Sequence, residues 1–214
     1  MRLIIGNKNY SSWSLRAWLP LRHFGLEFEE ERVALFEPGY KERILTYSPA
    51  GKVPVLIDGE AAIWESLAIG EYLAETLPEL EMWPLPAAER ALARSISAEM
   101  HAGFAQLRTH MPMNIRASHP GKGRTPGVEA DIARVCALWE QCLIGSGGPF
   151  LFGNFTIADA MYAPVVSRFI TYAVDLDSRL SEYVDRIWNL SAMREWRAAA
   201  LAETEFIDEA EPYR

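Results

Sequence analysis

Cysteine is scarce in this chain of 214 residues, which contains only Cys136 and Cys142. The two lie six residues apart, on different faces of a segment expected to be helical, and neither belongs to a Cys-x-x-Cys pair or a zinc-ligand spacing. This pattern argues against a disulfide framework and favours core thiols in a reducing compartment. The histidines show no metal-ligand spacing either, so we expect no metal.

Basic charge and long apolar runs are also lacking. The chain has 21 Lys and Arg against 29 Asp and Glu, a net charge of −8 that disfavours nucleic acid or an anionic membrane as partner. No apolar run is long enough to span a membrane, and the N-terminus lacks the charged start and apolar core of a signal peptide. We therefore expect a cytoplasmic protein.

Hydrophobic residues make up 50% of the chain, and their pattern changes near residue 80. Before that point strand and helix signals alternate, with strands expected at 3–5, 28–35, 53–57 and 61–64, and helices at 12–23, 41–47 and from 66. After it the signals are helical, at 87–111, 128–143, 160–173, 178–189 and 192–202. The sequence predicts an α/β domain over 1–78, a proline-rich linker over 79–86 and an all-helical domain over 87–214.

Three serines, Ser11, Ser12 and Ser14, lie where the first strand leads into the first helix. A serine there normally caps the helix by accepting a hydrogen bond from a backbone N–H. Three exceed what one cap requires, and a helix N-terminus also favours negative charge. A plain cap and an anion pocket are both open from these residues alone.

Pro54 lies within an apolar strand pattern, where proline removes a ladder hydrogen bond. It therefore marks a strand start or a tight turn. A cis bond would leave the backbone of Val53 free to pair with an extended peptide. A trans proline at a sheet edge is the alternative.

Four short motifs follow one another along the chain: Ser-Ser-x-x-x-Arg at 11–16, Ser-Pro-Ala-Gly-Lys-Val-Pro-Val-Leu at 48–56, Glu-Ser-Leu-Ala-Ile at 65–69 and Gly-Asn-Phe-Thr-Ile-Ala-Asp at 153–159. Together they resemble the cytosolic glutathione transferases of serine type, and most of all the zeta- and theta-like bacterial members. The resemblance covers the whole chain. It implies a thioredoxin-like N-terminal domain with a C-terminal helical bundle, glutathione as cosubstrate, and a homodimer. Zeta-class proteins have Cys after the paired serines, whereas this chain has Trp13.

The resemblance also implies a role for each motif residue. A serine hydroxyl is too weak a base to deprotonate a thiol, but it can donate a hydrogen bond to the thiolate. Ser11 is the first candidate for that donor and Ser12 the second. The expected glutathione-binding residues are Val53 for the cysteinyl backbone, held by a cis Pro54, Ser66 for the γ-glutamyl carboxylate, Glu65 for the ammonium and Lys52 for the glycyl carboxylate. For Glu65 and Lys52 an ordinary surface charge is the alternative.

We expect the pocket for the second substrate between the domains, against the long helix. Its expected lining is Trp13, Met100, Phe104, Leu107, Arg108 and Met111, although the same helical spacing also suits a core stripe. The expected activity is conjugation of the glutathione thiolate to a small hydrophobic electrophile. The alternatives are a glutathione-dependent maleylacetoacetate-type isomerase and a non-catalytic ligand-binding protein of the same fold. Disulfide exchange is disfavoured, because the first half contains no cysteine.

Overall fold

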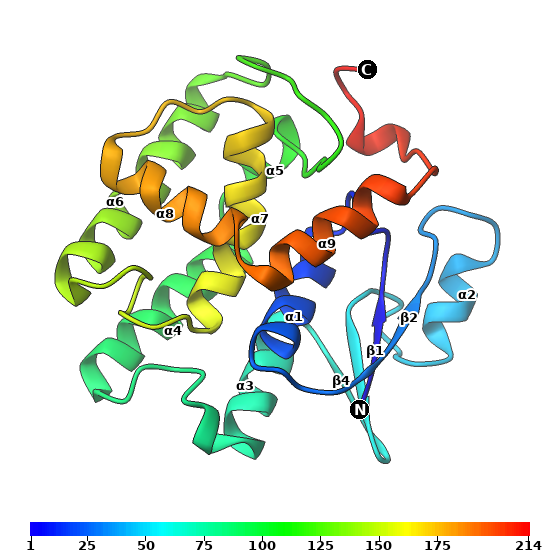
Figure 1. The fold of residues 1–214 in the computed structure, drawn as a ribbon. Helices are drawn as coiled ribbons and strands as arrows, with labels where there is room; N and C mark the ends of the chain where they lie inside the picture. The colour runs from blue at the N-terminus through cyan, green and yellow to red at the C-terminus, as the bar shows by residue number, and fades with distance from the viewer.

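A four-stranded sheet in the order β2-β1-β3-β4 organises the first half of the chain (Figure 1). The computed structural model describes residues 1–214. β1 pairs with β2 in parallel and with β3 antiparallel, and β4 pairs antiparallel with β3. A parallel pair requires a crossover, which α1 provides between β1 and β2. The elements are β1 Arg2–Ile5, α1 Ser12–His23, β2 Glu29–Arg32, α2 Tyr40–Leu45, β3 Val55–Asp58, β4 Ala61–Trp64 and α3 Ser66–Thr76.

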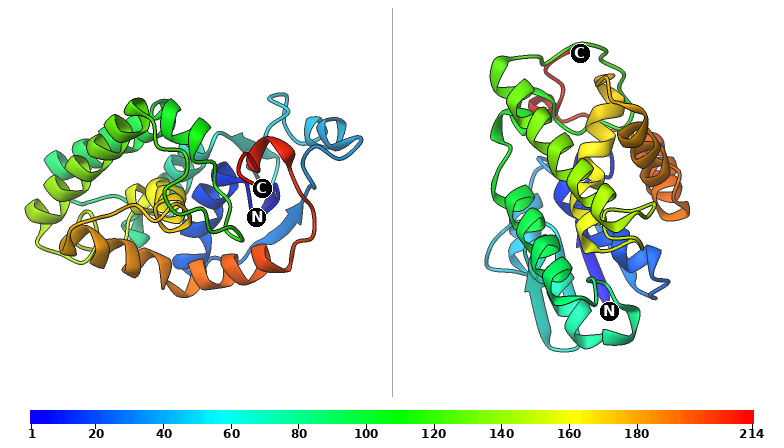
Figure 2. Two further views of the ribbon diagram at one scale, coloured as in Figure 1. Left: turned by 90° about the horizontal axis from the view of Figure 1, so that it is seen from above. Right: turned by 90° about the vertical axis from the view of Figure 1, so that its left-hand side faces the viewer.

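The rest of the chain is helical, with α7 at its centre (Figures 1 and 2). α7 is buried almost all round, as its apolar sequence predicts, and packs against α1, α4 and α8. One hydrophobic core therefore extends from the sheet into the helices. The elements are η1 Pro78–Leu80, α4 Ala87–Ala102, α5 Ala105–His110, α6 Pro126–Ser146, α7 Ile157–Thr171, α8 Ser178–Trp188, α9 Ser191–Ala202 and η2 Asp208–Ala210. The thioredoxin-like domain with a helical bundle is confirmed, and no helix is long and apolar enough to cross a membrane.

A capping box starts α7, as the Thr-x-x-Asp motif predicts. The buried Asp159 carboxylate accepts hydrogen bonds from the backbone N–H groups of Thr156 (2.8 Å) and Leu151 (3.1 Å). It also accepts from the hydroxyls of Thr156 (3.2 Å) and Tyr183 (3.1 Å). Burial raises the pKa of Asp159 to about 6. One carboxylate thus joins the start of α7 to α8.

The helix predicted over 87–111 is wrong in one respect, because the chain turns at Gly103 and Phe104 and divides it into α4 and α5. Phe104 has a φ of +58°, outside the helical region. The Arg108 guanidinium donates to the carbonyls of Gly103 (2.8 Å), Met100 and His101. These carbonyls have lost their helical partners at the break, so Arg108 satisfies the end of α4.

The segment after α9 crosses back from the helices and lies above the carboxyl end of β1 (Figures 1 and 2). The C-terminal segment therefore lies over the end of the sheet where α1 begins.

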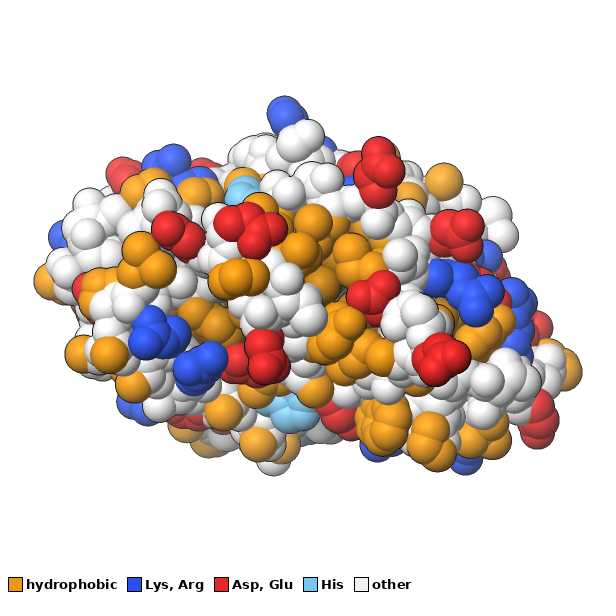
Figure 3. All heavy atoms as spheres, turned by 90° about the horizontal axis from the view of Figure 1, so that it is seen from below, with side chains coloured by type: hydrophobic (Ala, Val, Ile, Leu, Met, Phe, Trp, Pro, Cys, Tyr) orange, Lys and Arg blue, Asp and Glu red, His pale blue; other side chains and the backbone are white.

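The face seen from below in Figure 1 has hydrophobic side chains across its middle, with acidic ones among them and basic ones toward both ends (Figure 3).

Candidate active site

A cavity of about 580 Å³ lies where the start of α1, the loop before β3, the start of α3 and the C-terminal segment meet. This volume is within the roughly 300–1,000 Å³ typical of small-molecule sites. Seven of the predicted site residues line it: Ser11, Ser12, Trp13, Lys52, Val53, Pro54 and Glu65. The structure thus brings three of the four sequence motifs to one cavity.

The serines at the start of α1 include both a helix cap and a free hydroxyl. Ser11 is the N-cap: its Oγ accepts the backbone N–H of Ser14 (3.3 Å) and donates to the Ser14 Oγ (2.7 Å). The Ser14 Oγ also accepts the backbone N–H of Gly6 (3.0 Å), which ties the helix to the end of β1. The Ser12 hydroxyl lines the cavity and forms no hydrogen bond with the protein. The two interpretations of these serines are therefore compatible.

The loop before β3 presents an unpaired stretch of backbone to the cavity. The Val53–Pro54 peptide bond is cis, and β3 begins at Val55. Val53 lies outside the strand, and neither its N–H nor its C=O takes part in a hydrogen bond of the turns and loops. An extended peptide can pair with such a free edge.

The start of α3 lacks a side-chain cap. Glu65 is the N-cap residue, with a φ of +69°, and its side chain accepts no capping hydrogen bond. A positive φ at a non-glycine residue costs roughly 1–3 kcal/mol and concentrates at functional sites. Ser66 is 2% exposed, and its buried Oγ has no hydrogen-bond partner, although Ser66 itself does not line the cavity. Uncapped N–H groups beside a free hydroxyl form a site for an anion such as a carboxylate.

His101 also lines the cavity, although no sequence motif signals it. Its Nε2 lies 3.4 Å from a Glu65 carboxylate oxygen, and its ring packs edge-on against Trp13 at 5.0 Å. Burial lowers the pKa of His101, more than Glu65 raises it. The neutral imidazole therefore predominates at neutral pH.

The structure does not bring the predicted pocket residues of the long helix to this cavity. Met100, Leu107 and Met111 are fully buried in the core, Phe104 nearly so, and Arg108 binds the carbonyls at the end of α4. Their spacing marks the face of a helix that packs against other helices. The aromatic and aliphatic lining comes instead from other segments, and includes Phe36, Tyr40, Trp64, Ile207 and Ala210.

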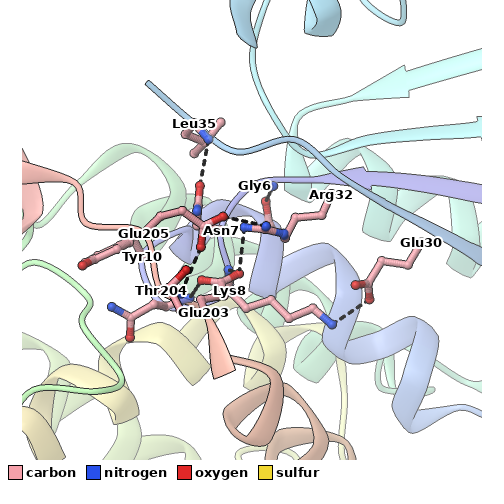
Figure 4. A network of polar contacts seen from close by, with 12 residues as sticks. Gly6, Asn7, Lys8, Tyr10, Glu30, Arg32, Leu35, Glu203, Thr204 and Glu205 are labelled. Atoms are coloured by element: carbon pink, nitrogen blue, oxygen red, sulfur yellow. Dashed lines mark hydrogen bonds and ion pairs between the residues drawn. The ribbon is translucent and has the colours of Figure 1, made fainter. Parts of the chain in front are cut away.

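The C-terminal segment forms one wall of the cavity and is held by charged groups (Figure 4). The Glu203 carboxylate accepts the backbone N–H groups of Lys8 (2.7 Å) and Asn9 (3.0 Å). Arg116 donates to the carbonyl of Glu205 (2.7 Å) and to the Tyr10 hydroxyl (2.8 Å). No sequence motif signals this wall, because its partners lie about 90 to 200 residues apart in the chain.

The two cysteines are free and lie outside the cavity, one half-buried and one buried. Burial raises the pKa of each thiol to about 11. Both are therefore protonated at neutral pH, which makes them poor nucleophiles.

Two family models match the chain: "Glutathione S-transferase, N-terminal domain" over residues 10–76 and "Glutathione S-transferase, C-terminal domain" over residues 89–199. A probable maleylacetoacetate isomerase of Caenorhabditis elegans is 30% identical over 167 residues, 77% of each chain. A zeta class glutathione S-transferase of Euphorbia esula is 29% identical over 170 residues, 78% of this chain and 76% of its own.

Solved structures show the same fold. A maleyl pyruvate isomerase described as a bacterial zeta-class glutathione S-transferase has a TM-score of 0.73 at 23% identity, covering 96% of this chain and 100% of its own. A Burkholderia glutathione transferase homologue with bound glutathione has a TM-score of 0.72 at 23% identity, covering 93% and 97%. The family models match both halves of the sequence. The chain therefore belongs to the glutathione S-transferase family.

Proposed function

We propose that this glutathione S-transferase adds the glutathione thiolate to a small hydrophobic electrophile, and that a serine hydroxyl at the start of α1 stabilises the thiolate. One observation supports this above all: a single cavity is lined by Ser11 and Ser12 at the start of α1, by Val53 with its free backbone, and by Glu65, the N-cap residue of α3. These features suit the thiol, the peptide backbone and the γ-glutamyl carboxylate of glutathione.

Ser11 is the proposed donor to the thiolate. A cysteine thiol ionises near pKa ~8.5, and a hydrogen bond to the charged form lowers that value. Ser11 can turn its proton to the sulfur because Ser14, whose Oγ is 2.7 Å away, carries a proton to donate in exchange. Together with the helix N-terminus, a shift of one to two pKa units corresponds to about 1.4–2.7 kcal/mol.

The remaining motif residues bind the tripeptide in this proposal. The Val53 backbone pairs with the cysteinyl residue, and Ser66 with the N–H groups of α3 holds the γ-glutamyl carboxylate. Glu65 faces the ammonium group. Lys52, exposed at the rim of the cavity, faces the glycyl carboxylate.

The test compares Ser11→Gly with its neighbour Ser12→Ala. Glycine keeps most of the N-cap stability, so the first variant removes the hydroxyl without unfolding the start of α1. We expect Ser11→Gly to raise the pKa of bound glutathione by about one unit, because the helix N-terminus remains, and to lower kcat/KM for 1-chloro-2,4-dinitrobenzene at pH 7 by up to about tenfold. Thiolate absorbance measured against pH reports the pKa directly.

The outcomes separate three assignments. If kcat/KM falls and the pKa of bound glutathione rises only in Ser12→Ala, the donor to the thiolate is Ser12, whose hydroxyl is free of protein partners. No change in either variant, with glutathione still bound, contradicts the serine mechanism. A wild type that binds glutathione without conjugating any electrophile supports the non-catalytic alternative.

A second candidate is glutathione-dependent isomerisation of a maleyl-type substrate, which the names of the curated relatives favour. Isomerisation regenerates glutathione, so the absence of a stable conjugate during turnover distinguishes it. We further propose that the protein acts as a homodimer in the cytoplasm. Sedimentation of the purified chain tests the dimer.

A further inference from the structure

We infer that Trp13 sets the substrate class of the cavity: its indole separates two arginines from the bound substrate, so the site accepts a flat, uncharged electrophile and rejects a dicarboxylate. This inference rests on the proposed conjugation activity, whose second substrate it specifies. It concerns a side chain that the glutathione-binding roles leave unused.

Trp13 lies between the cavity and two guanidinium groups. Its ring centroid is 4.5 Å from the Cζ atom of Arg16 and 4.9 Å from that of Arg108. Trp13 lines the cavity, and neither arginine does. Cations within about 6 Å of an aromatic face are attracted to it, so both guanidiniums hold the indole in place.

Arg16 has no counterion. It is 1% exposed, its Nε donates to the carbonyl of Met161 (3.0 Å), and its Nη1 and Nη2 have no hydrogen-bond partner. Burial lowers the pKa of Arg16 well below its ordinary value, and the positive charges of Arg108 and Arg168 lower it further. Two guanidinium groups therefore lie behind the indole, and the Nη atoms of Arg16 have neither an ion-pair partner nor a hydrogen-bond partner.

Once glutathione is bound, the cavity has no free cation for a second anionic ligand while Trp13 is in place. The Lys, Arg, Asp and Glu side chains that line it are Lys52, Glu65 and Glu209. Glutathione bound as the thiolate adds two more carboxylates, the thiolate and one ammonium. A dicarboxylate would therefore enter a negative cavity with no guanidinium within reach.

The other lining residues suit a flat, apolar molecule. Phe36, Tyr40 and Trp64 line the cavity together with Trp13, and the C-terminal segment adds Ile207 and Ala210. Aromatic rings stack on flat conjugated groups, and apolar surface is removed from water on binding. The charge and the lining of the cavity thus both favour a flat, uncharged electrophile.

The test uses a matched pair of unreactive probes, dimethyl phthalate and the phthalate dianion, which share a flat ring and differ in charge. Each is titrated into protein loaded with S-methylglutathione, so that no reaction occurs. We expect the wild type to bind the diester at least tenfold more tightly than the dianion. In Trp13→Ala we expect phthalate binding to strengthen at least tenfold and to weaken with added salt, because the guanidiniums become reachable.

Two further variants control the experiment. Trp13→Phe keeps an aromatic ring in front of the arginines and should retain the wild-type preference. Trp13→Leu is smaller than Trp and apolar, and it replaces Trp13→Ala if the alanine variant does not fold. Arg16→Met added to either small variant should remove much of the gained phthalate affinity, because the Nη atoms of Arg16 are the ones without a hydrogen-bond partner.

Equal affinity of the wild type for diester and dianion overturns the inference. So does a small variant that binds S-methylglutathione normally and gains no phthalate affinity. Failure of the wild type to bind S-methylglutathione contradicts the proposed function instead, and the two failures are therefore distinguishable.

Discussion

Replacing Ser66 by Ala should change stability and ligand affinity in opposite directions. Ser66 is 2% exposed at the first position of α3, and its Oγ has no hydrogen-bond partner in the protein. A buried hydroxyl without a partner costs about 1–3 kcal/mol of stability. The same hydroxyl is the proposed donor to the γ-glutamyl carboxylate of glutathione.

The expected changes in stability and in affinity follow from the ligand-free and the glutathione-bound states of this hydroxyl. Without ligand, Ser66→Ala removes an unsatisfied group and should stabilise the fold by about 1 kcal/mol, which raises Tm by roughly 2–4 °C in a chain of this size. With ligand, the lost hydrogen bond to a charged group is worth about 1.5–3 kcal/mol. Glutathione should therefore bind roughly tenfold to a hundredfold more weakly.

Ser97→Ala is the matched control. Ser97 lies in α4, is fully buried with an unpartnered Oγ, and does not line the cavity. It should give the same gain in Tm without a change in glutathione affinity. Thermal unfolding and calorimetric titration measure the two effects. Loss of stability with unchanged affinity in Ser66→Ala would refute the reasoning, because the hydroxyl would then be satisfied within the free protein.

Two more predictions concern titratable groups whose pKa is shifted by burial. Asp159→Ala should lower the free energy of unfolding by about 3–5 kcal/mol, because four buried donors lose their acceptor and the smaller side chain leaves a void. Urea unfolding measures the change, and a loss below about 1 kcal/mol would contradict the prediction. Burial lowers the pKa of His101, so the unfolded state binds its proton more readily and the contribution of His101 to stability falls as pH drops through about 6.5. His101→Gln should flatten the stability profile between pH 7 and pH 5, and an unchanged slope would contradict the assignment.

Elements whose ends depend on nearby residues were predictable. The helix predicted at 12–23 is α1, Ser12–His23, and the capping box at Thr156 starts α7. A cap is a hydrogen bond between residues about three positions apart, so its partners are visible in the sequence. The resemblance also predicts the cis bond before Pro54, which the structure contains.

The division of the helix at Gly103 and Phe104 was not predictable from periodicity. Apolar residues keep helical spacing across the break, and Met100, Leu107 and Met111 all join one core. What permits the turn is Arg108, which binds the released carbonyls from the next helix. A pattern of apolar positions contains no information about such a contact.

The sequence by itself determined the fold class and the motifs that meet at the cavity, because helix starts, strand starts and turns depend on backbone hydrogen bonds between near neighbours. Only the tertiary structure decided the rest of the lining. The segment after Glu203 forms one wall because the Glu203 carboxylate accepts hydrogen bonds from the backbone N–H groups of Lys8 and Asn9, which lie near the other end of the sequence. Trp13 faces the cavity, and its neighbour Arg16 is buried behind it, because α1 packs against α7. Long-range packing determines which face of an element is exposed, and short-range patterns do not specify it.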